Sequence, residues 1–304
     1  MKFFIPEDLS NIKSGKHKFL RQLKDALLDY GLVFKKSNPD IVLHLGRGYR
    51  EFIGKSKTIC RLDGLEFNIK KSYKKQNKKA MKAIEHSDAV VFQNQFCAEA
   101  YFKFLKIDRN ILHACILNGA FLKDKTRDES FHIVANCKWR PHKRLDDIIS
   151  CFLMARDRGF PLDLIITGDV KKKIKNKNIR YLGWLSGKKL DRVLSRSLFG
   201  IHLAWIDWCP NSVVEYICNN KPVIYSNSGG TKYVVKKNGV SIDDVDWNFD
   251  PLDLYNPPKI NREKVVDAMF YLLNRKVEID NSHIDISNIA QKYKKFFEEV
   301  LSNE

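Results

Sequence analysis

Short apolar runs alternate along this chain with longer stretches in which apolar residues recur every three or four positions. Runs of about four to eight apolar residues are typical of strands buried on both faces, and the longer periodic stretches predict amphipathic helices. In the first part of the chain, the pattern predicts strands at 2–6, 40–45, 57–62 and 89–94, and helices at 16–30, 69–86 and 95–105.

The second part of the chain repeats this alternation. The pattern predicts strands at 131–136, 162–168, 179–182, 199–204 and 222–225, helices at 143–158, 188–195 and 211–219, and, after an irregular stretch at 243–258, two last helices at 262–274 and 286–301. Strands that alternate with helices of about 10–15 residues predict parallel sheets covered by helices on both faces, an α/β class. Because residues 121–130 are polar and lack a period, we expect two doubly wound halves joined there.

The composition is that of a globular protein. Of the 304 residues, 44% are hydrophobic and 12% aromatic, which excludes intrinsic disorder. No stretch approaches the roughly 20 apolar residues that a membrane span needs. The seven cysteines are scattered without a C-x-x-C pair, which argues against a disulfide framework or a zinc knuckle and favours a cytoplasmic location.

Several familiar nucleotide-binding and catalytic motifs are either incomplete or absent. Residues 48–56 imitate a phosphate-binding loop, but five residues separate the two glycines where that loop has four. Gly46 and Gly48 lack the third glycine of a dinucleotide fingerprint, and neither H-E-x-x-H nor G-x-S-x-G occurs. The acidic residues 243–246 could bind a cation, but their turn-rich surroundings favour a solvated loop.

The formal net charge of +18 draws anions to the chain, and one group of cations lies where a parallel sheet binds its ligands. Directly after the strand at 131–136 come Lys138, Arg140, Lys143 and Arg144, at the start of a predicted helix. Free backbone amides and the helix dipole favour an anion at such a position. The alternative is a solvated basic loop.

A second strand-to-helix junction follows the strand at 199–204. The amides of Asn211 and Ser212 should point outward at an anion, and the carboxylates of Asp207 and Glu215 could hold neutral hydroxyls. Alternatively, Asp207 caps the helix and Glu215 faces solvent. A later turn contains Gly229 and Gly230, which would permit close approach of the backbone to a ligand, or form an ordinary turn.

These segments together resemble a known family. "HIVANCKWRPHKRLDDII", "DWCPNSVVE", "KPVIYSNSGGTKYVV" and "NIRYLGWL" are similar, in this order, to segments of retaining nucleotide-sugar glycosyltransferases of GT-B architecture, in glycosyltransferase family 4. "SDAVVFQNQF" and "ILNGAF" resemble family segments before the linker. The resemblance implies two Rossmann-like domains facing each other across a cleft, at 1–125 and 126–280, and a helix at 281–304 that crosses back to the first.

The resemblance also implies an activity. It is the metal-independent, retaining transfer of a hexose from a UDP-sugar or GDP-sugar donor to a glycan, lipid-linked or protein-linked acceptor, without a cofactor. Aspartate stands at 207 where the family has glutamate, and Tyr233 also replaces a glutamate. A protein that binds a sugar nucleotide without transfer is therefore one alternative, and a basic nucleic-acid-binding protein is another.

Site residues follow from the same resemblance. Lys138 and Lys143 are implied to contact the donor diphosphate, and Asp207 the donor sugar; these three are the catalytic candidates. Glu215 is implied to bind the ribose of the donor. The remaining donor-binding candidates are Asn211, Ser212, Arg140, Gly229, Gly230 and Gly15, which stands for a shortened glycine-rich loop. Candidates for the cleft in the first domain are Arg61, Asp63 and His44, at or near strand ends.

Much of the remaining positive charge lies on one predicted helix. Residues 69–84 contain no acid and place lysines at 70, 71, 74, 75, 78, 79 and 82, opposite an apolar stripe of Ile69, Tyr73, Ala80 and Ile84. The lysines could simply be solvated, or the face at 70–82 could dock on an anionic membrane or an acidic acceptor. A nucleic-acid partner is not expected, because Tyr73 lies on the apolar side and offers no stacking among the lysines.

Overall fold

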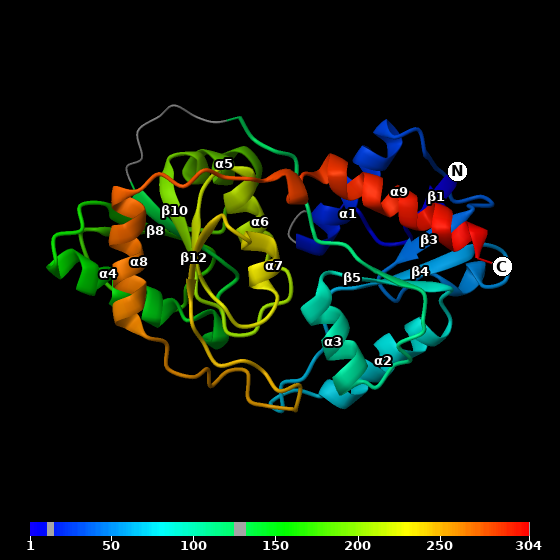
Figure 1. Cartoon of the computed structure of the whole chain (residues 1–304), viewed down its shortest axis with the longest axis horizontal. Helices are drawn as coiled ribbons and strands as arrows, with labels where there is room; N and C mark the ends of the chain where they lie inside the picture. Colours follow the sequence, from blue (N-terminus) through cyan, green and yellow to red (C-terminus); the bar gives the residue numbers. More distant parts are fainter. Residues whose placement is uncertain (11–14, 125–131, 304) are drawn as a thin grey trace. The chain divides into compact units, whose positions relative to one another are not determined.

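The computed structural model describes residues 1–10, 15–124 and 132–303 (Figure 1). It divides into two compact units: residues 1–121, 248–252 and 282–304 form the first, and residues 122–247 and 253–281 form the second. Most of the linker expected at 121–130 lies outside the described residues, as does Phe131, the first residue of an expected strand.

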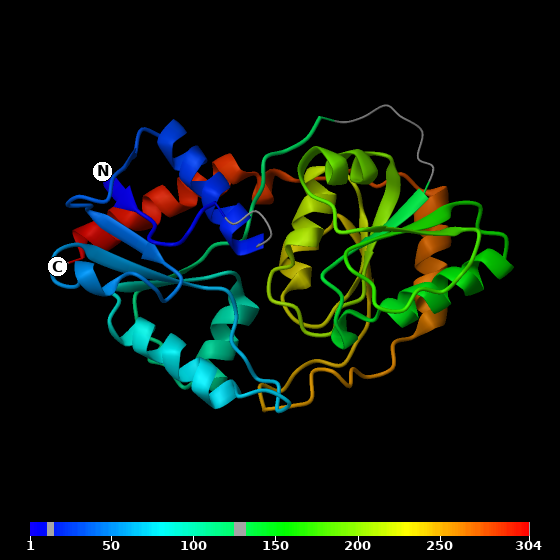
Figure 2. The ribbon, with the colours of Figure 1, turned by 180° about the vertical axis from the view of Figure 1, so that it is seen from behind.

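A six-stranded parallel sheet forms the centre of the first unit. Its order is β2-β1-β3-β4-β5-β6. The strands are β1 (Lys2–Phe4), β2 (Val33–Phe34), β3 (Ile41–His44), β4 (Lys57–Leu62), β5 (Ala89–Phe92) and β6 (His113–Cys115). Figure 2 shows α1 (Gly15–Asp29) and α9 (Ile286–Ser302) on one face of this sheet and α2 (Tyr73–Glu85) and α3 (Gln95–Phe104) on the other. Two short 3-10 turns, η1 (Arg50–Phe52) and η3 (Ser282–Ile284), complete the unit.

The second unit has a parallel sheet of the same size. Its order is β12-β11-β10-β7-β8-β9. The strands are β7 (His132–Asn136), β8 (Asp163–Thr167), β9 (Ile179–Gly183), β10 (Ser197–His202), β11 (Val223–Ser226) and β12 (Gly239–Ile242). The helices are α4 (Leu145–Asp157), α5 (Gly187–Ser195), α6 (Asn211–Cys218), α7 (Thr231–Val235) and α8 (Arg262–Asn274), with a 3-10 turn η2 (Pro141–Lys143) before α4. The doubly wound α/β class expected for both halves is confirmed.

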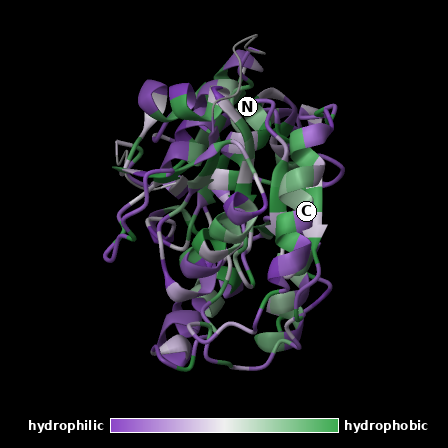
Figure 3. Cartoon of the chain, turned by 90° about the vertical axis from the view of Figure 1, so that its left-hand side faces the viewer, coloured by the Kyte–Doolittle hydropathy of each residue, from purple (hydrophilic) through white to green (hydrophobic). Residues whose placement is uncertain are grey.

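Each unit has its own apolar core. Strands β3, β5 and β11 are buried along their whole length, as is typical of parallel strands covered on both faces. Phe152 and Phe199 belong to the core of the second unit, and Phe3 and Phe297 to that of the first. In Figure 3, apolar and polar residues alternate around the helices, because each helix buries one side and exposes the other. Across the described part of the chain, no helix has the length and apolar character to cross a bilayer.

The basic helix differs from its prediction at the N-terminal end. It begins at Tyr73 instead of residue 69, so Lys70 and Lys71 precede it. Ile69 does not belong to the buried stripe, because 51% of its surface is exposed. Asn68 accepts a hydrogen bond from the amide of Lys70 at 3.0 Å and thereby closes a turn just before the helix.

Candidate anion-binding site of the second unit

The strand order of the second unit creates a switch point between β7 and β10. These two strands are parallel neighbours. After β7 the chain continues to β8 on one side, and after β10 it continues to β11 on the other. Ligands of open α/β sheets bind outside the carboxyl ends of the strands at such a point. The two strand-to-helix junctions singled out in the sequence therefore leave the sheet side by side.

Lys143 and Asp207 join these two junctions. Their side chains form an ion pair and are only 13% and 15% exposed. Burial would raise the pKa of Asp207, but Lys143 and a hydrogen bond from His202 hold it well below its usual range. Burial would lower the pKa of Lys143, and the neighbouring Asp207 raises it instead. Both groups are therefore charged at neutral pH, and Asp207 is suited to accept hydrogen bonds and not to donate a proton.

His202, at the end of β10, was missed in the sequence. It is 3% exposed, its Nε2 lies 2.9 Å from Asp207 Oδ2, and its Nδ1 lies 3.5 Å from the hydroxyl of Ser212. Burial lowers its pKa, so the ring is neutral, donates from Nε2 and accepts at Nδ1. His202 thus connects the carboxylate of Asp207 to the first turn of α6. The available signal was one polar side chain within the otherwise apolar run predicted as a strand at 199–204.

If this edge of the sheet carries the transfer reaction that the resemblance implies, His202 acts as a positioning residue, and its replacement should slow turnover without abolishing ligand binding. We expect His202→Leu to lower kcat by about tenfold, because Asp207 loses one of its fixed donors, worth roughly 1–2 kcal/mol. KM for the donor should change little. His202→Gln, which keeps a side-chain donor, should recover most of the loss. Equal defects in both variants, in KM as much as in kcat, would contradict the role assigned to Nε2.

The N-terminus of α6 lies directly after the Asp207 loop. Pro210 occupies the cap position, so no side-chain oxygen of a cap residue satisfies the first amides of the helix. Gly229 and Gly230 pack on the same loop: the Gly230 amide donates to the carbonyl of Asp207 at 2.6 Å, and a Cβ at Gly229 would lie 2.7 Å from that oxygen. The close approach expected of these glycines is therefore an approach to the backbone of Asp207.

Glu215 lies one turn further along α6 and reaches the end of β7. Its Oε2 accepts a hydrogen bond from Asn136 Nδ2 at 3.1 Å, and Asn136 Oδ1 in turn accepts from Thr167 at 2.7 Å. Glu215 is half-buried, so the solvent-facing alternative does not describe it. Lys138 and Arg140 are exposed, and within the described ranges neither forms an ion pair. Their charges remain available to a ligand at this edge of the sheet.

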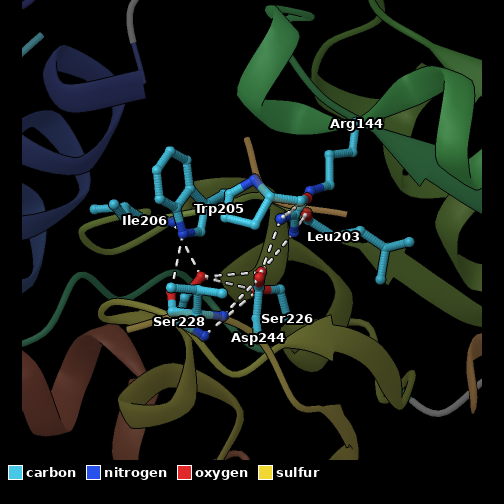
Figure 4. A network of polar contacts seen from close by, with 9 residues as sticks. Arg144, Leu203, Trp205, Ile206, Ser226, Ser228 and Asp244 are labelled. Carbon is cyan, nitrogen blue, oxygen red and sulfur yellow. Dashed lines mark hydrogen bonds and ion pairs between the residues drawn. The ribbon is translucent and has the colours of Figure 1, made fainter. Parts of the chain in front are cut away.

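Arg144 does not belong to this cluster, contrary to the prediction. It adopts a positive φ of 53° between η2 and α4, and its side chain is fully buried. Figure 4 shows it directed into the unit, where Nη1 contacts Asp244 at 2.5 Å and the carbonyl of Leu203 at 3.1 Å. Asp244, expected in a solvated loop, is also fully buried and accepts from Ser226 at 2.6 Å.

The same residues correct a second expectation. The prediction placed Lys143 at the beginning of the helix, but Lys143 lies in η2 and α4 begins at Leu145. Asp146 and Asp147 occupy the first turn of α4 and already complement its dipole. α6 has no acid in its first turn and no side-chain cap, so the dipole at its N-terminus, and not that of α4, is left to attract an anion.

The three cleft candidates of the first unit serve its interior. Arg61 is 1% exposed, and its Nε donates to the hydroxyl of Tyr293 on α9 at 3.0 Å. It also contacts Asp63 and Asn118. His44 is buried against Ser87 at 3.1 Å, and burial lowers its pKa to about 4.

Of these three, Asp63 is the most exposed, at 26% of its side chain. The last candidate of the first unit, Gly15, is the first residue of α1. Over the whole described chain, no three His, Cys, Asp or Glu side chains converge as metal ligands would.

Sequence comparison finds no relative. No family model matches the chain, and no curated protein matches it by sequence. Similarity appears only when structures are compared, and there it covers nearly the entire chain.

The similar structures are glycosyltransferases of the GT-B fold. Sucrose-phosphate synthase from Thermosynechococcus elongatus is 12% identical, with a TM-score of 0.65 over 99% of this chain and 96% of that one. AviGT4, a glycosyltransferase involved in avilamycin A biosynthesis, is 12% identical, with a TM-score of 0.64 over 100% of this chain and 99% of AviGT4. The pneumococcal O-GlcNAc transferase GtfA, in complex with UDP and GlcNAc, is 15% identical, with a TM-score of 0.66 over 92% of this chain and 60% of GtfA. The chain spans only 55% of TarM, another similar structure. At these identities the likeness establishes the fold.

Proposed function

We propose that this chain is a retaining, metal-independent glycosyltransferase that moves a hexose from a UDP-sugar or GDP-sugar to a glycan, lipid-linked or protein-linked acceptor. One observation carries the proposal. At the switch point of the second sheet, Lys143 and Asp207 form an ion pair beside the uncapped N-terminus of α6. A cation, a helix N-terminus without a side-chain cap and an ionised acid at one sheet edge are the groups that a nucleoside diphosphate sugar requires.

The reaction follows from electrostatics. The bond between the anomeric carbon and the diphosphate breaks, and the diphosphate leaves with the electron pair. Lys143, Lys138 and the first amides of α6 stabilise the negative charge that develops on it. Asp207 accepts hydrogen bonds from sugar hydroxyls, and Glu215 accepts those of the ribose.

Retention needs no protein nucleophile if the acceptor hydroxyl attacks from the face that the diphosphate leaves. The departing phosphate oxygen then takes the proton of the acceptor hydroxyl. Asp207 is a weak base for this step, because Lys143 and the hydrogen bond from His202 hold the pKa of its carboxyl well below the usual range.

The solved structures support the donor class. GtfA was crystallised with UDP and GlcNAc, and HepE of Anabaena with UDP and glucose. A chain that shares their fold and carries two basic side chains open to solvent at the switch point is suited to the same class of donor.

The test is release of nucleoside diphosphate by the purified full chain. We expect one of a panel of UDP-hexoses and GDP-hexoses to be hydrolysed slowly, and to be transferred faster when an acceptor glycan is added. The product should keep the anomeric configuration of the donor by NMR, and chelators should not slow the reaction. Binding of the donors without any release would instead identify a sugar-nucleotide-binding protein. Salt-dependent retention of oligonucleotides without binding of nucleoside diphosphates would identify a nucleic-acid-binding protein.

A further inference from the structure

The exposed side of α2 carries a dense group of lysines. Lys74, Lys75, Lys78, Lys79 and Lys82 are all exposed, and the one acid of the helix is its last residue, Glu85. Among the described residues, none of these five lysines forms an ion pair, whereas Lys71 before the helix pairs with Glu66 at 2.7 Å. Lysines four positions apart on a helix repel one another. This repulsion destabilises the helix, and binding to an anionic surface would reduce it.

A groove beside α2 adds an apolar component to this charge. It has a volume of about 520 Å³ and runs between α2, the end of α3 and residues 249–251. Its walls combine aromatic rings, such as Tyr73 and Phe104, with lysines on both helices. Lys103 lies 4.8 Å above the ring of Phe249, so these side chains present an ammonium group over an apolar floor.

One large apolar side chain is exposed just before the N-terminus of this basic helix. Ile69 is 51% exposed in the turn before α2, and the exposed Lys70 follows it. The amide of Ile69 donates a hydrogen bond to the carbonyl of Leu252 at 3.0 Å, which fixes the turn to the segment that borders the groove. A soluble polyanion would use the lysines and gain nothing from Ile69. A lipid surface would use both, because its anionic headgroups cover an apolar interior.

We propose that the basic face of α2, with Ile69 and the adjoining groove, docks the protein on an anionic lipid bilayer. The lysines contact the headgroup phosphates, Ile69 enters the boundary between headgroups and acyl chains, and the groove receives part of one lipid molecule. This docking surface lies entirely within the first unit. It does not depend on the transfer reaction proposed above.

The test is sedimentation of the full chain with vesicles of phosphatidylcholine, with or without phosphatidylglycerol. We expect binding only to the anionic vesicles, and less binding as salt is raised. Replacing Lys75, Lys79 and Lys82 together with glutamine should weaken that binding about 100-fold, since each lysine near an anionic surface contributes about fivefold. These three lysines lie outside the groove, and removing mutually repelling charges should not destabilise the helix.

A matched control removes the same charge elsewhere. Lys171, Lys172 and Lys175 are exposed in a loop of the second unit that is also rich in lysine. Their replacement with glutamine should change vesicle binding by no more than about twofold, because unspecific attraction depends on net charge and is screened by salt. Equal losses in the two triple variants would overturn the proposal.

A single variant separates a bilayer from a soluble polyanion. Ile69→Ser should weaken binding to anionic vesicles about fivefold, from the apolar area that no longer enters the lipid. It should leave retention of a single-stranded oligonucleotide unchanged. Tighter binding of the oligonucleotide than of the vesicles, or vesicle binding that Ile69→Ser does not affect, would contradict a lipid surface.

Discussion

Replacing Lys143 with methionine should lower the rate of the proposed hexose transfer by about 10²–10³-fold, the usual effect of removing one group that stabilises a developing negative charge. Methionine keeps much of the apolar stem of lysine and removes the ammonium group. The side chain is only 13% exposed, so its ammonium group acts in a mostly desolvated site, where charges interact more strongly than in water. The measurement is release of nucleoside diphosphate under single-turnover conditions, with donor in excess of its dissociation constant.

This substitution also leaves the mostly buried Asp207 without its cationic partner, with hydrogen bonds only from His202 and the amide of Trp208 among the described contacts, so its effect on folding needs a control. Thermal unfolding of Lys143→Met should remain cooperative, with a lower Tm. Lys264→Met is the matched control, because Lys264 forms an exposed ion pair with Asp243 on the same unit. It should keep both Tm and activity. A folded Lys143→Met variant with the wild-type rate would remove Lys143 from the mechanism.

Replacing Arg144 with methionine should lower the free energy of unfolding of the second unit by about 3–5 kcal/mol, because Asp244 would remain as an uncompensated buried charge. Both side chains are fully buried, and Nη2 of Arg144 also donates to the carbonyl of Pro258 at 2.8 Å. The measurement is denaturant unfolding at neutral pH. The matched control is Arg262→Met: Arg262 pairs with Asp147 at 2.8 Å at the surface, where an ion pair contributes no more than about 1 kcal/mol.

A double variant separates the charge pair from the other contacts of Arg144. Arg144→Met combined with Asp244→Asn should recover part of the lost stability, because the second substitution removes the unpaired charge. Additive losses in the double variant would show that the carbonyl contacts, and not the ion pair, account for the effect of Arg144.

Among the described strands, the sequence predicted all but β2, β6 and β12, and it predicted even the three-residue β1. β4 at Lys57–Leu62 and α8 at Arg262–Asn274 have the predicted bounds. β2 and β6 have two and three residues, too few to show a period. They form because their backbones pair with the neighbouring strands β1 and β5. α7 (Thr231–Val235) was not predicted, because five residues that follow two glycines carry no helical repeat.

The site was predictable to the extent that topology determines it. Residues that follow neighbouring parallel strands must emerge at one edge, which is why Lys143 and Asp207 could be expected together. The direction of Arg144 could not be predicted. Its partner Asp244 is 100 positions away, and a loop residue with positive φ turns its side chain in a way that no periodicity reports. His202 was overlooked because it continues a buried strand, where a polar residue usually satisfies a structural hydrogen bond.

The central claim is that the edge formed by β7 and β10 binds a diphosphate. Calorimetric titration of the full chain with UDP, GDP and the corresponding nucleosides tests it directly. One of the two diphosphates should bind at least about 100-fold more tightly than its nucleoside, because two charge-assisted hydrogen bonds are worth about 3–6 kcal/mol together. Lys143→Met should remove most of that difference. Equal affinity for nucleoside and nucleoside diphosphate, or no binding of either, would contradict the account.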